Sequence, residues 1–245
     1  MGKTIGDGKY QKYDWLYHEL ITLGKTEKQV AKEQNLKLRL IVKWTDIHQL
    51  GDNNFAKLKT LSSKQISLIK ASLLGDGHVS HNMFVVSHCD RQKDYLFWKY
   101  NLLKDLCKKP PSYYKEGTAN FNGKIYHRSA SYRFCTRKIE QIQQLKAIPK
   151  IKIIRDLTEF EFAVWMLDDG YRGEYSWELC LGSLNKEEKK ELDLKLQQFG
   201  LKYKYKVDPR YIRFNCESSR KIDEIITNQI PNELDIVKYK VLERR

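Results

Sequence analysis

The sequence predicts an α+β fold in which two pseudo-symmetric units follow a small all-helical module. Three observations support this prediction: an apolar nine-residue segment occurs twice, similar sequences follow each copy, and a separate helical pattern fills the start of the chain. We therefore expect the helical module at residues 1–54 and the two units at residues 55–150 and 151–245. Because one chain carries both units, we also expect a monomer.

The duplicated segment covers residues 69–77 and 162–170, and each copy is a run of apolar and small residues that ends in an acid and a glycine. At helical period each copy is a helix stopped by its glycine, which places Asp76 and Asp169 in the last turn. Unpaired carbonyls and the negative end of the helix dipole disfavour a carboxylate there by roughly 0.3–1 kcal/mol unless a cation lies beside it. Because this rule is broken twice, we expect a site whose carboxylate and carbonyl oxygens suit Mg²⁺.

Strand and helix patterns alternate after the first copy. Residues 78–87 alternate in polarity and predict one strand. Residues 94–106 place aromatic and leucine side chains at helical spacing, and Lys108-Lys109-Pro110-Pro111 ends that helix. Residues 112–136 contain two segments that predict a hairpin around Asn122-Gly123.

The second unit repeats this order. We expect a strand near residues 177–182, a Lys- and Glu-rich helix over residues 185–199, and strands on either side of Asp208-Pro209. Short sequences near the end of each unit also recur in the same order: Tyr132-Arg133-Phe134, 137–142 and Ile148-Pro149, then Ile212-Arg213-Phe214, 220–225 and Ile230-Pro231. Each unit therefore reads helix, strands, helix, strands, helix.

The duplicated segment resembles the signature of the LAGLIDADG homing endonucleases, which ends in alanine, acid and glycine and has its metal-binding acid at the eighth position. Asp76 and Asp169 occupy that position, and four residues depart from the signature: Lys70, Ala71, Val164 and Trp165. The resemblance covers residues 61–245 and implies two αββαββα units with saddle-shaped antiparallel sheets. It also implies Mg²⁺-dependent cleavage of double-stranded DNA, with Mn²⁺ as a substitute, at a long asymmetric target with short 3′ overhangs.

The resemblance further implies which residues form the site. The metal ligands would be Asp76, Asp169, Gly75 and Asp168. The catalytic residues would be the two acids with one lysine each, Lys146 before Ile148-Pro149 and Lys240 after Tyr239, with Lys238 as a competitor. A lysine beside each metal can order the attacking water and neutralise charge on the phosphate.

One strand suggests how the protein would hold DNA. In residues 201–207, period two places Lys202, Lys204 and Lys206 on one face and Tyr203, Tyr205 and Val207 on the other, towards a core. Antiparallel strands of this kind can enter the major groove. Arg133 and Arg213 belong either to the same kind of face or to an ordinary charged surface.

Residues 1–54 carry a helix-turn-helix pattern. Residues 26–36 predict the first helix and a turn at Asn35, a second helix begins near Lys37, and residues 15–23 supply a supporting helix. On the second helix Lys37, Arg39 and Lys43 would contact phosphates. The linker to the units would be residues 51–54. An ordinary three-helix packing module is the alternative interpretation.

Composition agrees with a nucleic-acid partner. The formal net charge is +14 and the isoelectric point is about 9.4, although a solvated basic face also fits these values. We expect no membrane span and no secretion, hence the cytoplasm of a bacterium or phage-infected cell, or an organelle matrix. The five cysteines are scattered, and the spacing of His78, His81, His88 and Cys89 fits no common zinc set.

Two other functions remain open at this point. An intron maturase that binds its intron RNA would also be basic, and a non-catalytic DNA-binding regulator could use the same scaffold. An intein is not expected, because the sequence shows no splice-junction nucleophile and no terminal His-Asn.

Overall fold

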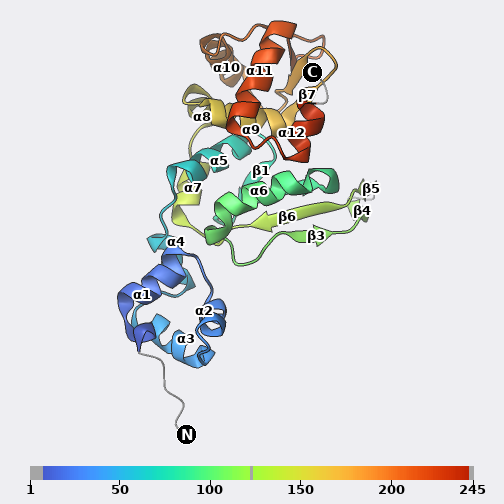
Figure 1. Ribbon diagram of the computed structural model, residues 1–245. Coiled ribbons are helices and arrows are strands. Elements are labelled where there is room, and N and C mark those ends of the chain that lie inside the picture. Colours follow the sequence, from blue (N-terminus) through green and yellow to red (C-terminus); the bar gives the residue numbers. More distant parts are fainter. Residues whose placement is uncertain (1–7, 122–123, 243–245) are drawn as a thin grey trace.

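The computed structural model describes residues 8–121 and 124–242 and has the predicted α+β architecture (Figure 1). Helices α5, Ser63–Leu74, and α9, Glu159–Asp169, pack against each other where the two units meet. The helical module lies against the first unit, on the side away from the second unit (Figure 1). The paired helices therefore form the centre around which both units are arranged.

The two central helices begin in the same way. Ser62 and Thr158 are the N-caps, and each forms a capping box with the residue three positions later, Gln65 and Glu161. Glu161 is buried and also pairs with Lys70 of α5 at 3.3 Å. Lys70, which departs from the family signature, thus joins the two motif helices.

The first unit contains one four-stranded antiparallel sheet in the order β1-β2-β6-β3. Its elements are β1 Gly77–Ser80, β2 Met83–Cys89, α6 Lys93–Leu103, β3 Ser112–Tyr114, β4 Gly117–Phe121, β5 Lys124–Arg128, β6 Ser131–Cys135, α7 Glu140–Lys146 and α8 Lys150–Arg155. Strands β4 and β5 pair only with each other within the described residues. The predicted hairpin is therefore present, although its turn at Asn122-Gly123 lies outside the described residues.

The prediction of one strand over residues 78–87 is wrong, because the chain reverses in the middle of it. Ser80 pairs with Met83, and the two residues between them, His81 and Asn82, have φ values of 49° and 62°. Positive φ at both central residues is the geometry of a type I′ hairpin turn. The reversal brings the end of β2 back to the start of β1.

The second unit repeats the strand order of the first, as β7-β8-β10-β9. Its elements are β7 Gly170–Arg172, β8 Trp177–Cys180, α10 Lys186–Gln198, β9 Tyr203–Tyr205, β10 Tyr211–Phe214, α11 Cys216–Gln229 and α12 Asp235–Lys240. The pseudo-symmetric fold predicted from the sequence is confirmed. The two units differ in that β4 and β5 lengthen the second hairpin of the first unit.

The predicted core face of residues 201–207 is correct only in part. Tyr203 and Tyr205 both donate hydrogen bonds to Asp193 of α10, so they face the helical layer. Val207 is fully exposed, because β9 ends at Tyr205.

The helical module has the predicted helix-turn-helix order. It comprises a 3-10 turn Lys9–Gln11, α1 Tyr13–Tyr17, a π-helical turn His18–Thr22, α2 Glu27–Glu33, α3 Leu38–Ile47 and α4 Asp52–Leu58. Asn35 has a φ of 52°, as expected for the turn residue, and Lys37 is the N-cap of α3. The prediction of a linker over residues 51–54 is wrong: residues 52–54 begin α4, which is held in place by the buried Phe55.

The module docks closely on the first unit. Gly24 has a φ of 66°, and a Cβ atom there would lie only 1.6 Å from the carbonyl oxygen of Asp105. The Lys59 ammonium lies 2.6 Å from the Asp105 carboxylate and donates to the Thr22 carbonyl at 2.7 Å. Arg137 of the first unit donates to the Lys25 carbonyl at 3.1 Å. The module is thus fixed in position rather than tethered.

None of the helices that the structure describes is both long and apolar enough to cross a membrane.

Candidate active site

The two acids lie at the ends of the central helices. Asp169 is the last residue of α9, as predicted, whereas Asp76 lies just beyond α5, after the C-cap Gly75. A Cβ atom on Gly75 would lie 2.5 Å from the Cβ of Asp168. Only glycine allows this close crossing, which brings the ends of both helices together.

Asp168 is held in a buried ion pair between the two units. Its carboxylate accepts hydrogen bonds from Lys99 Nζ at 2.7 and 2.9 Å and from the Tyr95 hydroxyl at 3.0 Å. The side chains of Asp168 and Lys99 are both completely buried. The backbone N–H of Asp76 also points to Asp168, at 3.4 Å. A lysine from α6 therefore neutralises the acid that precedes Asp169.

His88 on β2 lies between Asp76 and Asp168. Its Nδ1 is 3.3 Å from the Asp76 carboxylate, and its Nε2 is 4.0 Å from Asp168. Nε2 is buried and has no hydrogen-bond partner within the described residues. Burial raises the pKa of Asp76, but the His88 hydrogen bond and the charges of Lys99 and Lys240 outweigh it, and the pKa lies below its usual value.

Asp169 has a different environment from Asp76. Burial raises its pKa to about 6, with the charges of Asp76 and Asp168 adding to the effect. A hydrogen bond from Trp165 Nε1 at 3.2 Å and the charge of Lys240 act in the opposite direction. Trp165, which departs from the signature, is thus a direct partner of the second acid. The two acids are not electrostatically equivalent.

Lys240 supplies the cation that an acid in the last helical turn requires. Its Nζ donates to the carbonyls of Leu167 at 2.7 Å and Gly170 at 2.8 Å, at the C-terminal end of α9. Burial lowers its pKa to about 8, although the three nearby aspartates oppose this change. Lys238, the alternative candidate for the second active-site lysine, is exposed and pairs with Asp235 at 3.4 Å.

Lys146 is not brought to the first acid in the same way. It is exposed at the end of α7, and no hydrogen bond or ion pair joins it to Asp76 in the part of the chain that the structure describes. The lysine of the first unit that does contact an acid of the site is Lys99, which donates to Asp168.

Three site residues were missed by the sequence analysis: His88, Tyr95 and Lys99. Lys99 did leave a signal, because the buried residues of α6 are Tyr95, Leu96, Lys99 and Leu103, so a lysine lies on the apolar face of that helix. His88 left little signal beyond the alternation of β2, where it follows the buried Val86. A lysine is almost never fully buried unless it is paired.

The residues predicted to bind DNA are on exposed surfaces of all three parts. Lys202 and Lys204 are exposed, and Lys206 and Arg213 pair with Glu178 of β8 at 2.8 and 2.6 Å. Arg133 is exposed on β6, where it lies opposite Ser87 and Ser112 rather than an acid. In the helical module Lys37, Arg39 and Lys43 are exposed at and along α3.

The chain is similar to known proteins in sequence and in fold. The sequence model of the LAGLIDADG DNA endonuclease family matches residues 66–222. The homing endonuclease I-WcaI, in a structure bound to its DNA recognition sequence, is 20% identical, with a TM-score of 0.62 over 77% of this chain and 91% of that one. I-DmoI, in complex with DNA and Ca, is 11% identical, with a TM-score of 0.40 over 66% of this chain and 90% of that one.

A curated relative is the Protein RecA of Mycolicibacterium flavescens, which is 23% identical over 262 residues. The match covers 90% of this chain and spans 57% of that protein's length.

Proposed function

Since the chain belongs to the LAGLIDADG DNA endonuclease family, we propose that it hydrolyses both strands of duplex DNA at one long, asymmetric target and leaves short 3′ overhangs. The observation that carries the proposal is the pair of acids at the meeting ends of α5 and α9. Each acid has its own set of polar partners, as a site with two cleavage centres requires. Both acids belong to one chain, so a monomer suffices.

The donor atoms fit a hard divalent cation, and we infer Mg²⁺ with Mn²⁺ as a substitute. Lys99 already neutralises Asp168, which leaves the carboxylates of Asp76 and Asp169 as ligands, together with the main-chain carbonyls of Gly75 and Asp168. A cation held there would supply an activated water and neutralise charge on the scissile phosphate. The Nε2 of His88, which has no hydrogen-bond partner within the described residues, offers a further polar atom 4.0 Å from the Asp168 carboxylate.

The remaining site residues would position the two carboxylates and neutralise negative charge on the phosphate. His88 holds the Asp76 carboxylate in position, and Trp165 holds that of Asp169. Each acid would therefore present a defined oxygen to the metal ion. Lys240 places a positive charge where negative charge develops on the phosphate. On the second sheet Glu178 holds Lys206 and Arg213, which would contact phosphates or guanine together with Lys202 and Lys204.

The direct test uses a randomised duplex DNA library, because the target is unknown. The full chain with Mg²⁺ should release ends that define one long, asymmetric sequence cut in both strands, and EDTA should stop the reaction. Sequencing of the released ends measures both the site and the overhang. Binding to DNA without any released ends would favour a non-catalytic regulator.

Lys240 provides a test within the site. Lys240→Met should slow cleavage at saturating protein with little change in DNA affinity, because a charge that acts on the transition state lowers kcat rather than ground-state binding. Single-turnover rates and equilibrium binding on the same duplex separate the two quantities. Lys238→Met, two residues away and exposed, is the matched control and should cleave normally. Equal loss of affinity in both variants would make Lys240 a simple phosphate contact.

A further inference from the structure

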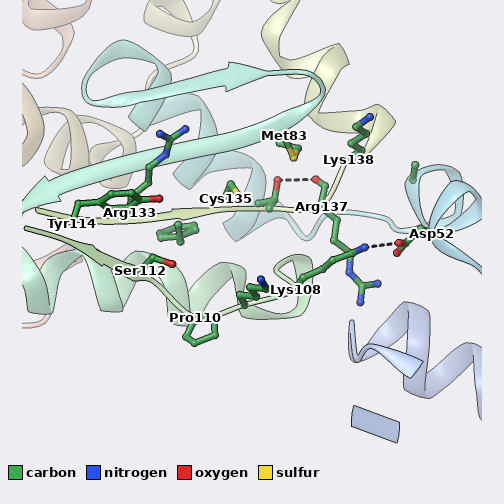
Figure 2. A pocket seen from close by; sticks show the side chains of 14 residues that line it. Asp52, Met83, Lys108, Pro110, Ser112, Tyr114, Arg133, Cys135, Arg137 and Lys138 are labelled. Atoms are coloured by element: carbon green, nitrogen blue, oxygen red, sulfur yellow. Dashed lines mark hydrogen bonds and ion pairs between the residues drawn. The ribbon is translucent and has the colours of Figure 1, made fainter. Parts of the chain in front are cut away.

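A basic groove of about 770 Å³ lies between the helical module and the first sheet. Figure 2 shows its walls: Asp52 of α4 on one side, Arg133 of β6 on another, and Lys108, Arg137 and Lys138 from the connecting segments. Lys109 also lines it. Five cations and one acid thus surround a single groove, and its lining includes neither of the acids Asp76 and Asp169 nor the lysines Lys99 and Lys240.

Two of these cations hold the groove together. Lys108 forms an ion pair with Asp52 across the boundary between the first unit and the module. The Arg137 guanidinium lies 4.2 Å from the centre of the Phe55 ring and donates to the Lys25 carbonyl. Both side chains are therefore committed to the docking of the module, and this docking fixes the shape of the groove.

The other three cations are available to a ligand. Lys109, Arg133 and Lys138 are exposed and have no ion-pair partner among residues 8–121 and 124–242. Ser112 lies directly across the strand pair from Arg133, and Tyr114 lies two residues further along β3. Ammonium, guanidinium and hydroxyl groups in one groove are the donors that proteins direct at the phosphates of nucleic acids.

We propose that this groove binds the phosphate backbone of duplex DNA that flanks the first unit's half of the target. The proposal rests on the proposed function and deepens it, because it makes the DNA interface longer on one side. The helical module packs on the first unit through α4 against α7, Lys59 against Asp105, and Arg137 against Lys25. The DNA track therefore continues from the first sheet towards α4 on this side.

The test compares two charge-matched double variants. Lys109→Gln with Lys138→Gln removes two groove cations, and Lys186→Gln with Lys190→Gln removes two exposed cations of α10. Binding to a fluorescein-labelled 40-base-pair duplex of mixed sequence is measured from low to high salt. Each lost phosphate contact should reduce the slope of log K against log salt by about 0.9, so the groove variant should lose about 2 and the control nothing. Equal slopes for both variants would overturn the proposal.

A second arm uses the target duplex that the library experiment returns, with its flank shortened on either side. The wild-type affinity should fall when the flank next to the first unit is removed, and the groove variant should be insensitive to this removal. If removal of this flank still lowers the affinity of the groove variant, the proposal is contradicted. It is also contradicted if the groove substitutions weaken binding to a structured RNA, measured in parallel, but not to duplex DNA. If the wild-type chain cuts no DNA, the proposed function fails, whereas the salt slope still decides the groove.

Discussion

Replacement of Asp76 or Asp169 by Asn should reduce double-strand cleavage by several orders of magnitude and leave DNA binding nearly unchanged. Asparagine keeps the shape of the side chain but removes the negatively charged carboxylate that would bind the divalent cation. Cleavage and binding of one target duplex are measured side by side for each variant. Asp156→Asn, which removes an exposed acid between α8 and α9, is the control and should behave as the wild type. Cleavage at the wild-type rate by either site variant would show that the substituted acid is not a required metal ligand.

The two variants should also differ in pH dependence, since the remaining acids differ in pKa. Asp76→Asn leaves Asp169, whose pKa stays above its usual value because of burial, although loss of the Asp76 charge lowers it from about 6. Its residual nicking should therefore rise with pH below about 6, as the carboxyl loses its proton. Asp169→Asn leaves Asp76, whose pKa lies below the usual value, so its nicking should be flat over the same range. Identical pH profiles would show that the two environments do not control the reaction.

Replacement of Lys99 by Met should destabilise the protein by about 3–5 kcal/mol, because it leaves the buried Asp168 carboxylate without its counter-charge. The free energy of unfolding is measured by urea denaturation with fluorescence of the tryptophans. Lys93→Met, on the exposed face of the same helix, should change it by less than about 0.5 kcal/mol.

A second substitution tests the cause of this loss. Lys99→Met combined with Asp168→Asn removes both charges and should be more stable than Lys99→Met alone, because no uncompensated charge remains buried. If the double variant is less stable than the single variant, packing of the lysine chain rather than its charge explains the effect.

The fold was predictable where the information is local and repeated. The apolar runs before Asp76 and Asp169 fix the central helices by their period, and the recurrence of similar segments fixes the order of elements in each unit. The hairpin at His81 and Asn82 was missed because alternation continues through it without a glycine, and the reversal depends on two residues adopting positive φ. The helix at Asp52 was missed because its stability comes from burial of Phe55 against distant residues.

The site was predictable only as far as the motif reaches. The acids and Lys240 follow from the resemblance, and the structure places all three together. Lys99 meets Asp168 across 69 residues of sequence, and no local pattern specifies that contact. Lys146 differs from these residues: its position before Ile148-Pro149 fits the resemblance, and at the end of α7 it is exposed, with no hydrogen bond or ion pair to either acid among the described residues.

The crossing of Gly75 and Asp168 limits how such proteins can be recombined. Asp168 of the second unit depends on Lys99 and Tyr95 of the first, whereas the buried residues of the corresponding helix α10 are Leu192 and Leu196. A dimer engineered from two second units would bring two carboxylates together without a lysine for either. A chimera that joins the second unit to a foreign half-domain must therefore import a glycine at the crossing and a buried lysine beneath it. The halves are complementary parts, not interchangeable modules.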